Sequence, residues 1–414
     1  MKRVFFHLMA TLVVITLLLE GSSCATSAPT TTAPKPPTEA PIKIGLVSSQ
    51  SGPYAAMPPY TTAAAQMAID DVNASGGLLG RPVELIVKDD MGDPSTVAQK
   101  ANELQAAGVV GIVGPFLDAS ALALNQWSRD NRVPATFSNP TLSLRTNEFS
   151  RYSFHAAPDS WALARVLARG IAAQNVNSIY FLSADWVGAH EIYNLFWPEM
   201  KKLKPDIIDL GVTWVGMTEM EFSNIISAVL AKKPDLILNG IAGPQYLSFI
   251  QQGQRFSLFS KTKVAGTYLL SADGVAPLGK DCPEGIQAVT YCPFYLDEKP
   301  MRDFAQAYYA RNRVYPGDTT LSFYIGTLSL IEAIKKANSA DPEKMIAALE
   351  TMTIDTPTGA ISYSDYAHQA DLPIWYASSG YSKDFPSIAV GVNLTKYRSG
   401  VYPTKDEILA LRRK

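Results

Sequence analysis

The chain has few of the residues from which catalytic and metal sites are usually built. Its 414 residues include 3 cysteines and 4 histidines. No Cys-x-x-Cys pair occurs, and no cysteine stands near a histidine at the spacing of a zinc site. The sequence also lacks a Gly-x-Ser-x-Gly nucleophile elbow, a His-Glu-x-x-His motif and a phosphate-binding loop. We therefore expect no metal, no cofactor and no enzymatic activity.

Charge of one sign and long apolar runs are also scarce. Lysine and arginine number 36 against 38 aspartates and glutamates, which gives a formal net charge of −2. This balance gives no reason to expect nucleic-acid binding. After Cys24, no apolar stretch approaches the ~20 residues that span a bilayer. We therefore expect contact with a membrane only through the N-terminal leader.

The N-terminus has the pattern of an export signal. A basic start, a short apolar run and small residues precede Cys24, so residues 1–23 are predicted to be a signal peptide. Gly21-Ser22-Ser23-Cys24 resembles the lipobox of bacterial lipoproteins, in which the cysteine is acylated, although Gly21 stands where leucine is usual. We expect a lipid on Cys24 to hold the protein at the periplasmic or extracellular face of the membrane. Simple secretion and an uncleaved anchor are the alternatives.

Two features of composition divide the rest of the chain. Residues 24–41 are rich in threonine and proline, which predicts a semi-stiff tether rather than a packed segment. About 370 residues remain from residue 42 onward, more than one typical core holds, so two lobes are expected.

Cys282 and Cys292 remain as an even pair if Cys24 is acylated. In an oxidising compartment a bridge across this short loop would stabilise the fold by roughly 2–3 kcal/mol on the chain-entropy model. Two free thiols are the alternative. We predict the disulfide.

Strand-like and helix-like segments alternate along the folded part. A continuous apolar run at 42–47 precedes a segment at 61–73 whose apolar residues have helical spacing, and Gly76-Gly77 ends that helix. The same alternation restarts after about residue 158. Such alternation predicts two α/β lobes with parallel sheets and helices on both faces. Ligands of open parallel sheets bind beyond the carboxyl ends of the strands.

Several of the connecting loops resemble those of solute-binding proteins of the branched-chain amino-acid type, which serve ABC transporters. The resemblance covers roughly residues 42–375, and its motifs occur in the expected order. These motifs are Ser51-Gly52-Pro53-Tyr54-Ala55-Ala56, Ala74-Ser75-Gly76-Gly77-Leu78-Leu79-Gly80-Arg81, Asp89-Asp90-Met91-Gly92-Asp93-Pro94, Val113-Gly114-Pro115, Val133-Pro134, Glu221-Phe222-Ser223 and Thr356-Pro357-Thr358-Gly359.

The resemblance implies a two-lobed type I periplasmic binding protein. Each lobe is then a mostly parallel sheet with helices on both faces, and three crossovers form the hinge. Carried onto this chain, the crossovers fall near 155–158, 290–295 and 357–363. The implied parts are lobe one at 42–156 plus 295–357, lobe two at 157–294 plus 358–400, and a C-terminal tail at 401–414 with the pattern of a short amphipathic helix.

The function implied by the resemblance is capture of a small molecule by hinge closure and its delivery to an ABC import permease. The solute would be an amino acid, an amide or an aromatic or other organic acid, and the protein is expected to act as a monomer. The alternatives are a sensory binding protein of the same fold and an envelope hydrolase, for which no nucleophile motif is present.

In this family the loop after Gly-Pro holds the carboxylate of the solute through a serine and backbone N–H groups. On this chain Asp118 stands at the position of that serine. A fixed carboxylate would repel a ligand carboxylate by roughly 4 kcal/mol at about 4 Å and an effective dielectric near 20. Two alternatives remain: Asp118 turns away and caps the following helix, or Ser120 takes the place of the serine.

The other implied contacts lie on equivalent loops. Thr141 matches the family threonine that binds a solute, and Trp186 matches an aromatic residue that covers it. The alternatives are a simple turn residue at Asn139 and core packing of Trp186. The family's acidic residue for an ammonium group is missing near Tyr268, where the nearest acid is Asp273. Amides and aromatic compounds are therefore candidates beside amino acids. The predicted ligand-binding residues are Tyr54, Phe116, Leu117, Asp118, Ser120, Asn139, Pro140, Thr141, Trp186 and Tyr268.

Overall fold

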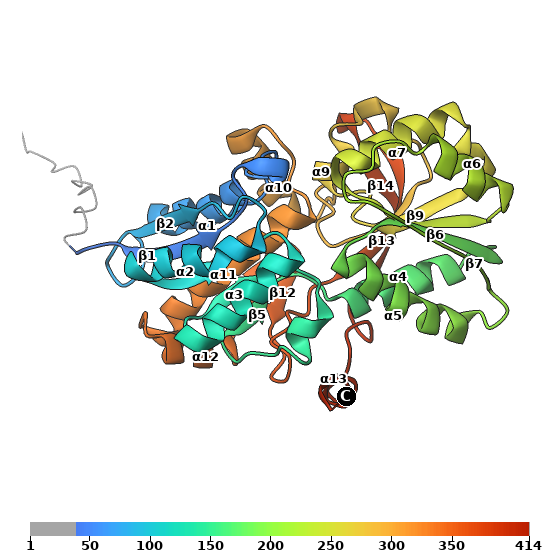
Figure 1. Cartoon of the computed structure of the whole chain (residues 1–414). Coiled ribbons are helices and arrows are strands. Elements are labelled where there is room, and N and C mark those ends of the chain that lie inside the picture. Colours follow the sequence, from blue (N-terminus) through green and yellow to red (C-terminus); the bar gives the residue numbers. More distant parts are fainter. Residues whose placement is uncertain (1–38, 414) are drawn as a thin grey trace, which may run out of the picture. The chain divides into compact units, whose positions relative to one another are not determined.

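The computed structural model describes residues 39–413. The predicted signal peptide (1–23), Cys24 and nearly all of the predicted tether lie outside the described residues. Two large sheets, each with its own helices, and one two-stranded hairpin make up the described part of the chain (Figure 1). Among residues 39–413 no helix is both long enough and apolar enough to cross a bilayer.

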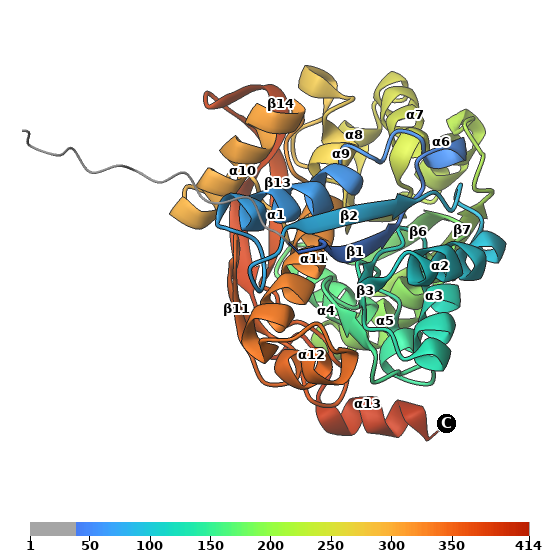
Figure 2. The same ribbon diagram turned by 90° about the vertical axis from the view of Figure 1, so that its left-hand side faces the viewer.

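The first lobe contains a five-stranded parallel sheet in the order β2-β1-β3-β4-β5. One core lies between this sheet and α1, α10, α11 and α12, and a second core lies between its other face and α2 and α3 (Figure 2). The elements are β1 (Ile42–Val47), α1 (Thr62–Ala74), β2 (Val83–Lys88), α2 (Val97–Ala106), β3 (Val109–Val113), α3 (Asp118–Asn131), β4 (Ala135–Phe137), β5 (Ser153–His155), α10 (Lys299–Asn312), α11 (Asp318–Ala337) and α12 (Pro342–Leu349).

The second lobe contains a seven-stranded sheet in the order β14-β13-β10-β9-β8-β6-β7. Its β6 to β10 are parallel, whereas β13 and β14 are antiparallel. Helices α4 and α5 cover one face, and α6, α7, α8 and α9 cover the other. The elements are α4 (Ser160–Ala172), β6 (Ser178–Ala184), α5 (Val187–Leu203), β7 (Ile208–Val215), α6 (Ser223–Ala231), β8 (Leu236–Gly240), α7 (Gly243–Arg255), α8 (Leu258–Lys261), β9 (Lys263–Thr267), α9 (Ala272–Val275), β10 (Gln287–Thr290), β13 (Ile374–Ser382) and β14 (Phe385–Tyr397).

This architecture confirms the predicted α/β class with two mostly parallel sheets. Local sequence explains where the elements begin and pack. The side chain of Asp159 accepts a hydrogen bond of 2.7 Å from the N–H of Ala162 and so caps α4. Glycine is required at Gly45 in β1, because a Cβ atom there would lie 2.9 Å from Leu104 of α2. Helix and sheet can therefore approach closely at this point.

The chain crosses between the lobes three times. The first crossing joins β5 to α4, and the second follows β10. The third lies later than the predicted 357–363. A hairpin of β11 (Thr353–Thr356) and β12 (Gly359–Ser362) pairs Ile354 with Ile361, and both side chains are buried in the first lobe. The chain enters the second sheet only at Ile374, because these apolar residues keep the hairpin in the first core.

Hydrogen bonds hold the crossings together. The N–H of His155 donates to the carbonyl of His368 at 2.8 Å, and the N–H of Ala370 donates to the carbonyl of His155 at 3.0 Å. These bonds join the first crossing to the third. At the second crossing, Oδ1 of Asp318 accepts from Thr290 Oγ1 at 2.8 Å, from Tyr291 N at 2.8 Å and from Cys292 N at 2.7 Å. The start of α11 is therefore fixed to the end of β10.

The predicted disulfide between Cys282 and Cys292 is wrong, because both cysteines are free and buried. Cys282 packs in a core of the second lobe, whereas Cys292 packs in a core of the first lobe, just after the chain has crossed. Burial raises the pKa of the Cys282 thiol to about 12. Both cysteines thus act as small apolar core residues.

The C-terminal tail contains the expected short helix, α13 (Lys405–Arg412), which begins with a capping box between Thr404 and Glu407. Arg165 of α4 donates to Glu407 at 2.5 Å. At the other end of the helix, Arg412 donates to the backbone carbonyl of Arg145 at 2.9 Å. The tail therefore contacts α4 of the second lobe and a loop of the first lobe.

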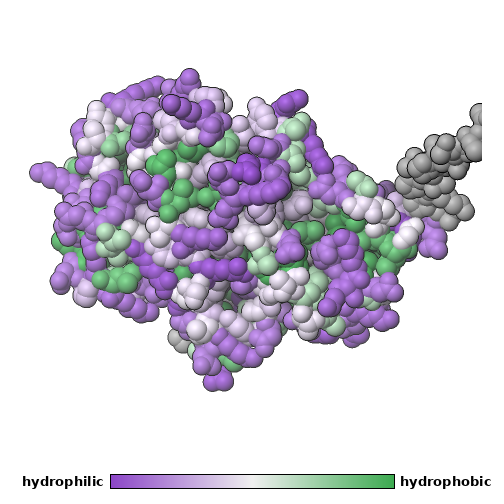
Figure 3. All heavy atoms as spheres, turned by 180° about the vertical axis from the view of Figure 1, so that it is seen from behind, coloured by the Kyte–Doolittle hydropathy of each residue, from purple (hydrophilic) through white to green (hydrophobic). Residues whose placement is uncertain are grey.

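The exposed surface is mostly polar. Figure 3 shows one face of the molecule, on which hydrophilic residues surround smaller hydrophobic groups. Ile208 at 54% exposure is the most exposed of the large apolar side chains in the described part of the chain. Such scattered apolar residues are normal on a soluble surface.

We predict that Asp318 makes stability fall with rising pH. Burial raises the pKa of Asp318 from 3.8 to about 7. Between pH 4 and 7 the folded protein therefore holds a proton on Asp318 that the unfolded chain releases. The stability that this proton contributes is lost as the pH rises through that window. Asp318→Asn keeps the Oδ1 acceptor and removes the titration. The free energy of unfolding of the wild type should fall relative to this variant by up to about 4 kcal/mol from pH 4 to 7.

Chemical unfolding at a series of pH values measures this difference. The exposed carboxylate variant Asp384→Asn serves as the control, and it should follow the wild-type curve. Parallel curves for Asp318→Asn and the wild type would contradict the prediction.

Candidate functional site

The loops after β3 and β4 meet at the carboxyl end of the first sheet. Nδ2 of Asn139 donates to the carbonyl of Phe116 at 2.7 Å and to Oδ1 of Asp118 at 3.2 Å. Asn139 is 1% exposed, so both bonds form away from water. The structure therefore brings together the two loops of the first lobe that sequence analysis selected.

The N-terminus of α5 in the second lobe lies against the same carboxylate. A Cβ atom placed on Gly188 would lie 3.0 Å from Oδ2 of Asp118 and 2.3 Å from the ring of Trp186. The ring of Trp186 is fixed by a hydrogen bond of 3.1 Å from Nε1 to the carbonyl of Gly240. We give the name interlobe site to loops 114–120 and 138–141 of the first lobe, loop 184–188 and the end of β8 of the second lobe, and the charged residues that pack against these loops.

Asp118 is the first residue of α3 but does not cap it. The residue at the cap position is Leu117, and no side chain caps this helix. Burial raises the pKa of Asp118, while the nearby hydroxyl of Thr141, the hydrogen bond from Asn139, the charge of Arg145 and the N–H of Gly188 act in the opposite direction. The carboxylate of Asp118 therefore points into the interlobe site and not onto its own helix.

The other predicted aromatic residues lie at different depths. Tyr268 packs on apolar residues of both lobes, and its backbone is left-handed with φ of 63°. Burial raises the pKa of Tyr268 well above its ordinary value, and the charges of Asp318 and Asp118 raise it further. Tyr54 contacts Phe116 with ring centroids 5.7 Å apart, at the outer part of the first lobe.

Arg145 is a central residue that sequence analysis missed. Its side chain is fully buried, and its guanidinium makes four hydrogen bonds. Nε donates to Gln369 Oε1 at 2.9 Å, Nη1 to the carbonyls of Asn139 at 2.9 Å and Thr141 at 2.8 Å, and Nη2 to the carbonyl of Ala157 at 3.2 Å. Burial lowers the pKa of Arg145 to about 10, although neighbouring carboxylates favour its charged form.

Glu191 is a second residue that sequence analysis missed. Its Oε2 accepts from Ser160 Oγ at 2.6 Å and from Leu142 N at 2.8 Å. Leu142 belongs to the first lobe, whereas Glu191 and Ser160 belong to the second. Burial raises the pKa of Glu191. No local sequence pattern marks this bond or the hydrogen bonds of Arg145, because the partners come from irregular segments.

Several buried polar atoms of the site have no hydrogen-bond partner among the described residues. They are Ser120 Oγ, Asn139 Oδ1, Thr141 Oγ1 and, at the end of β8, Asn239 Oδ1. The first three come from the predicted residues. A buried polar group without a partner costs free energy, so such groups mark a place where a ligand or water binds. Pro140 is also part of the site, and its carbonyl accepts from Ser160 N at 2.8 Å.

The acidic cluster after β2 does not form part of the site. Asp89 and Asp90 fix the loop after β1, where Asp89 accepts from Gln50 N at 2.8 Å, and Asp93 accepts from Ser95 N at 2.9 Å in its own loop. Within residues 39–413 no group of three or more acidic, histidine or cysteine residues is arranged to hold a metal.

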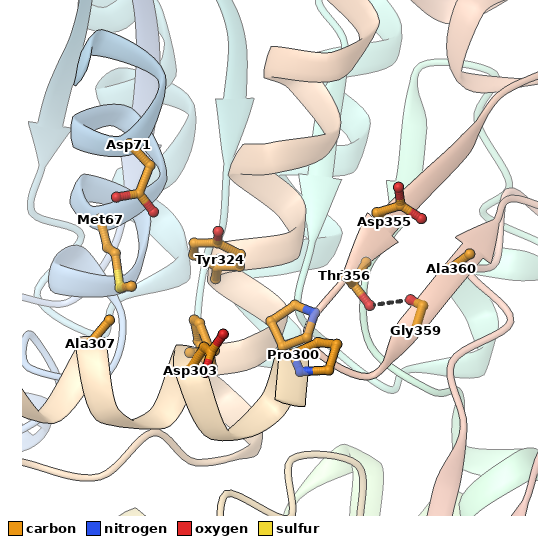
Figure 4. A pocket seen from close by; sticks show the side chains of 12 residues that line it. Met67, Asp71, Pro300, Asp303, Ala307, Tyr324, Asp355, Thr356, Gly359 and Ala360 are labelled. Carbon is orange, nitrogen blue, oxygen red and sulfur yellow. Dashed lines mark hydrogen bonds between the residues drawn. The ribbon is translucent and has the colours of Figure 1, made fainter. Parts of the chain in front are cut away.

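A cavity of about 10 Å³ lies beside Trp186 and Asn239, which is room for roughly one water molecule. A larger cavity of about 460 Å³ lies elsewhere in the first lobe, between α1, α10, α11 and the β11–β12 hairpin (Figure 4). None of the predicted ligand-binding residues lines the larger cavity. Its walls carry Asp71, Asp303 and Asp355, and Thr356 closes the hairpin by a bond to the carbonyl of Gly359.

Comparison with known proteins gives one consistent result. Residues 41–382 match the family described as periplasmic binding protein. The leucine-, isoleucine-, valine-, threonine- and alanine-binding protein of Pseudomonas aeruginosa is 24% identical over 326 residues, which cover 78% of this chain and 86% of that protein.

Solved structures of ABC transporter binding proteins have the same fold. An amino-acid ABC transporter substrate-binding protein from Pseudomonas fluorescens Pf-5 superposes with a TM-score of 0.79 at 19% identity, covering 89% of this chain and 99% of that one. A solute-binding protein from Rhodopseudomonas palustris BisB5, in complex with 3,4-dihydroxy benzoic acid, gives a TM-score of 0.77 at 20% identity, covering 86% and 97%. At these identities the likeness shows the two-lobed fold.

We predict that Gly188→Ala separates the lobes. The added methyl group meets both the Trp186 ring and the Asp118 carboxylate, so it should destabilise the described arrangement by about 1–3 kcal/mol, as overpacking usually does. The radius of gyration from solution scattering should rise, and the unfolding temperature should fall. Gly216→Ala is the matched control, because a Cβ atom there meets nothing within 4 Å. Equal scattering and stability of the two variants would refute the prediction.

Proposed function

We propose that this chain, which belongs to the periplasmic binding protein family, captures a small molecule between its two lobes and delivers it to the permease of an ABC importer. The observation that carries the proposal is the set of buried polar atoms without partners at the strand ends. Ser120, Asn139 and Thr141 supply them from the first lobe and Asn239 from the second. A solute that binds there contacts both lobes at once.

Hinge closure is the mechanism that this geometry supports. The lobes are joined by three crossings, and contacts such as that between Glu191 and Leu142 exist only when the lobes meet. A ligand favours the closed arrangement only through its higher affinity for that arrangement. A micromolar solute supplies about 8 kcal/mol of binding free energy in total. Part of that free energy is used to order the hinge, and the permease would then recognise the closed form.

Small organic molecules with a polar end are the class of solute that the relatives support. The Pseudomonas aeruginosa relative is named for aliphatic amino acids and threonine, and the Rhodopseudomonas palustris structure holds an aromatic acid. We extend this range to the present chain as amino acids, amides and aromatic or other organic acids. Trp186, Tyr268 and Tyr54 are the residues proposed to contact the body of the solute, and Phe116 and Leu117 to line its entry.

Family membership also gives the location, since periplasmic binding proteins act outside the cytoplasmic membrane. We propose in addition that Cys24 is acylated and tethers the folded part to that membrane. Cells that produce the full chain should retain it in the membrane fraction. The Cys24→Ser variant should appear in the soluble extracytoplasmic fraction, and an equal membrane share for both proteins would rule out the lipid anchor.

Capture without chemical change is the expected outcome of the decisive experiment. The purified monomer is screened by thermal shift against amino acids, amides, aromatic acids and amines. A solute at 100 times its dissociation constant should add about 2.7 kcal/mol of stability. The same solute should reduce the radius of gyration and be recovered intact after unfolding. A solute recovered cleaved or modified would indicate an enzyme, and an unchanged scattering curve across the panel would exclude hinge capture.

A further inference from the structure

The interlobe site holds more buried negative charge than positive charge. Asp118, Asp159 and Glu191 all act on the guanidinium of Arg145. Arg145 and Asp159 are 0% exposed, whereas Asp118 keeps partial exposure. With all of these groups ionised, three carboxylates face Arg145. The other cation near them, Arg165, lies close to Asp159 but pairs with Glu199 and Glu407. An uncompensated buried charge is costly, so a bound cation would offset part of this excess.

The fully buried cation of this group, Arg145, is not free to bind a ligand carboxylate. Four of the five N–H groups of a guanidinium are used by Arg145 for Gln369 and for the carbonyls of Asn139, Thr141 and Ala157. Its complete burial also keeps it out of contact with a solute. The N-terminal end of α5, where an anion would otherwise be favoured, already faces the protein's own Asp118.

The two unpartnered amide atoms of the site are oxygens, which need a hydrogen-bond donor, whereas the unpartnered hydroxyls of Ser120 and Thr141 can donate or accept. Nδ2 of Asn139 donates to Phe116 O and Asp118, which fixes the amide so that Oδ1 is the free atom. Nδ2 of Asn239 donates to the carbonyl of Ile241 at 3.2 Å, so its Oδ1 is free in the same way. Neither atom can bind a carboxylate. Both can accept from an ammonium, amidinium or guanidinium group.

An aromatic ring completes this arrangement. Trp186 and the carboxylate of Asp118 lie against the same residue, Gly188, from opposite lobes. A cation over the face of an indole ring is attracted by the ring electrons, and most strongly when water is excluded. A carboxylate beside an indole is therefore suited to a positively charged nitrogen, which gains from both groups.

We propose that the solute of this protein carries a cationic nitrogen group, and that Asp118 binds this group together with Oδ1 of Asn139. The inference rests on the proposed function, because it names the solute class for the same site. It assigns Asp118 as the residue that determines specificity, and it separates this chain from proteins of the same fold that hold an aromatic acid.

Matched ligands test the inference on the wild-type protein without any substitution. Leucine is compared with isoamylamine, which lacks the carboxylate, and with isocaproate, which lacks the amine. Benzylamine, benzamide and benzoate form a second set with one ring and three end groups. Titration calorimetry should show isoamylamine and benzylamine binding at least about tenfold more tightly than isocaproate and benzoate, a difference of about 1.4 kcal/mol.

Asp118→Asn then removes the charge and keeps the shape. Amine affinity should fall at least about 30-fold, as when one partner of a buried charge pair is removed. Benzoate affinity should stay equal or rise. Asp130→Asn is the matched control, since this carboxylate lies on the same helix as Asp118 but is exposed near the other end of α3, outside the site. Amine affinity in this control should stay within about twofold of the wild type, because exposed charges contribute little.

The outcomes separate the two proposals. The inference is overturned if the wild type binds carboxylates as tightly as amines, or if Asp118→Asn leaves amine affinity unchanged. Either result leaves the proposal of solute capture intact. The inference is also overturned, and solute capture again stands, if no amine binds while another solute of the wider screen closes the lobes. If no solute in either panel changes the scattering curve, the proposed function itself fails.

Discussion

The hydrogen bonds of one buried guanidinium, that of Arg145, hold the functional part of this protein together. They reach the carbonyls of the loop after β4, the first crossing at Ala157 and the third crossing at Gln369. Loop and hinge are therefore parts of one polar network rather than independent segments. Removing such a fully buried charge would leave several acceptors without donors, which is among the costliest changes a core can suffer.

That network also explains the chemistry of the neighbouring carboxylates. Asp159 caps α4, Glu191 bonds to both Ser160 and Leu142, and Asp118 bonds to Asn139. Asp159 and Glu191 use their carboxylate oxygens in these structural hydrogen bonds. Asp118 is the exception, because it lies at the meeting point of the lobes, retains exposure and does not cap its helix. A carboxylate in such a place is better explained by recognition than by stability.

Much of this could be predicted from the sequence because it depends on local patterns. Apolar runs and helical spacing predict the parallel sheets, and the strand-end rule selects the loops that carry Asp118, Asn139 and Trp186. Arg145 and Glu191 gave no signal, since their partners lie in irregular segments far along the chain. The free thiols were mispredicted because an even number of cysteines says nothing about which core each one joins. The third crossing comes late because Ile354 and Ile361 are buried in the core of the first lobe. No local sequence pattern shows which of the two cores these residues join.

The C-terminal helix has a practical consequence. Residues beyond 382 lie outside the segment that matches the family, yet α13 contacts Arg165 through Glu407 and the backbone of Arg145 through Arg412. A dye, affinity tag or surface linker fused behind this helix is therefore attached next to the moving parts. Fusions that are meant to leave the motion undisturbed are better placed ahead of β1, which belongs to the first sheet and precedes all three crossings.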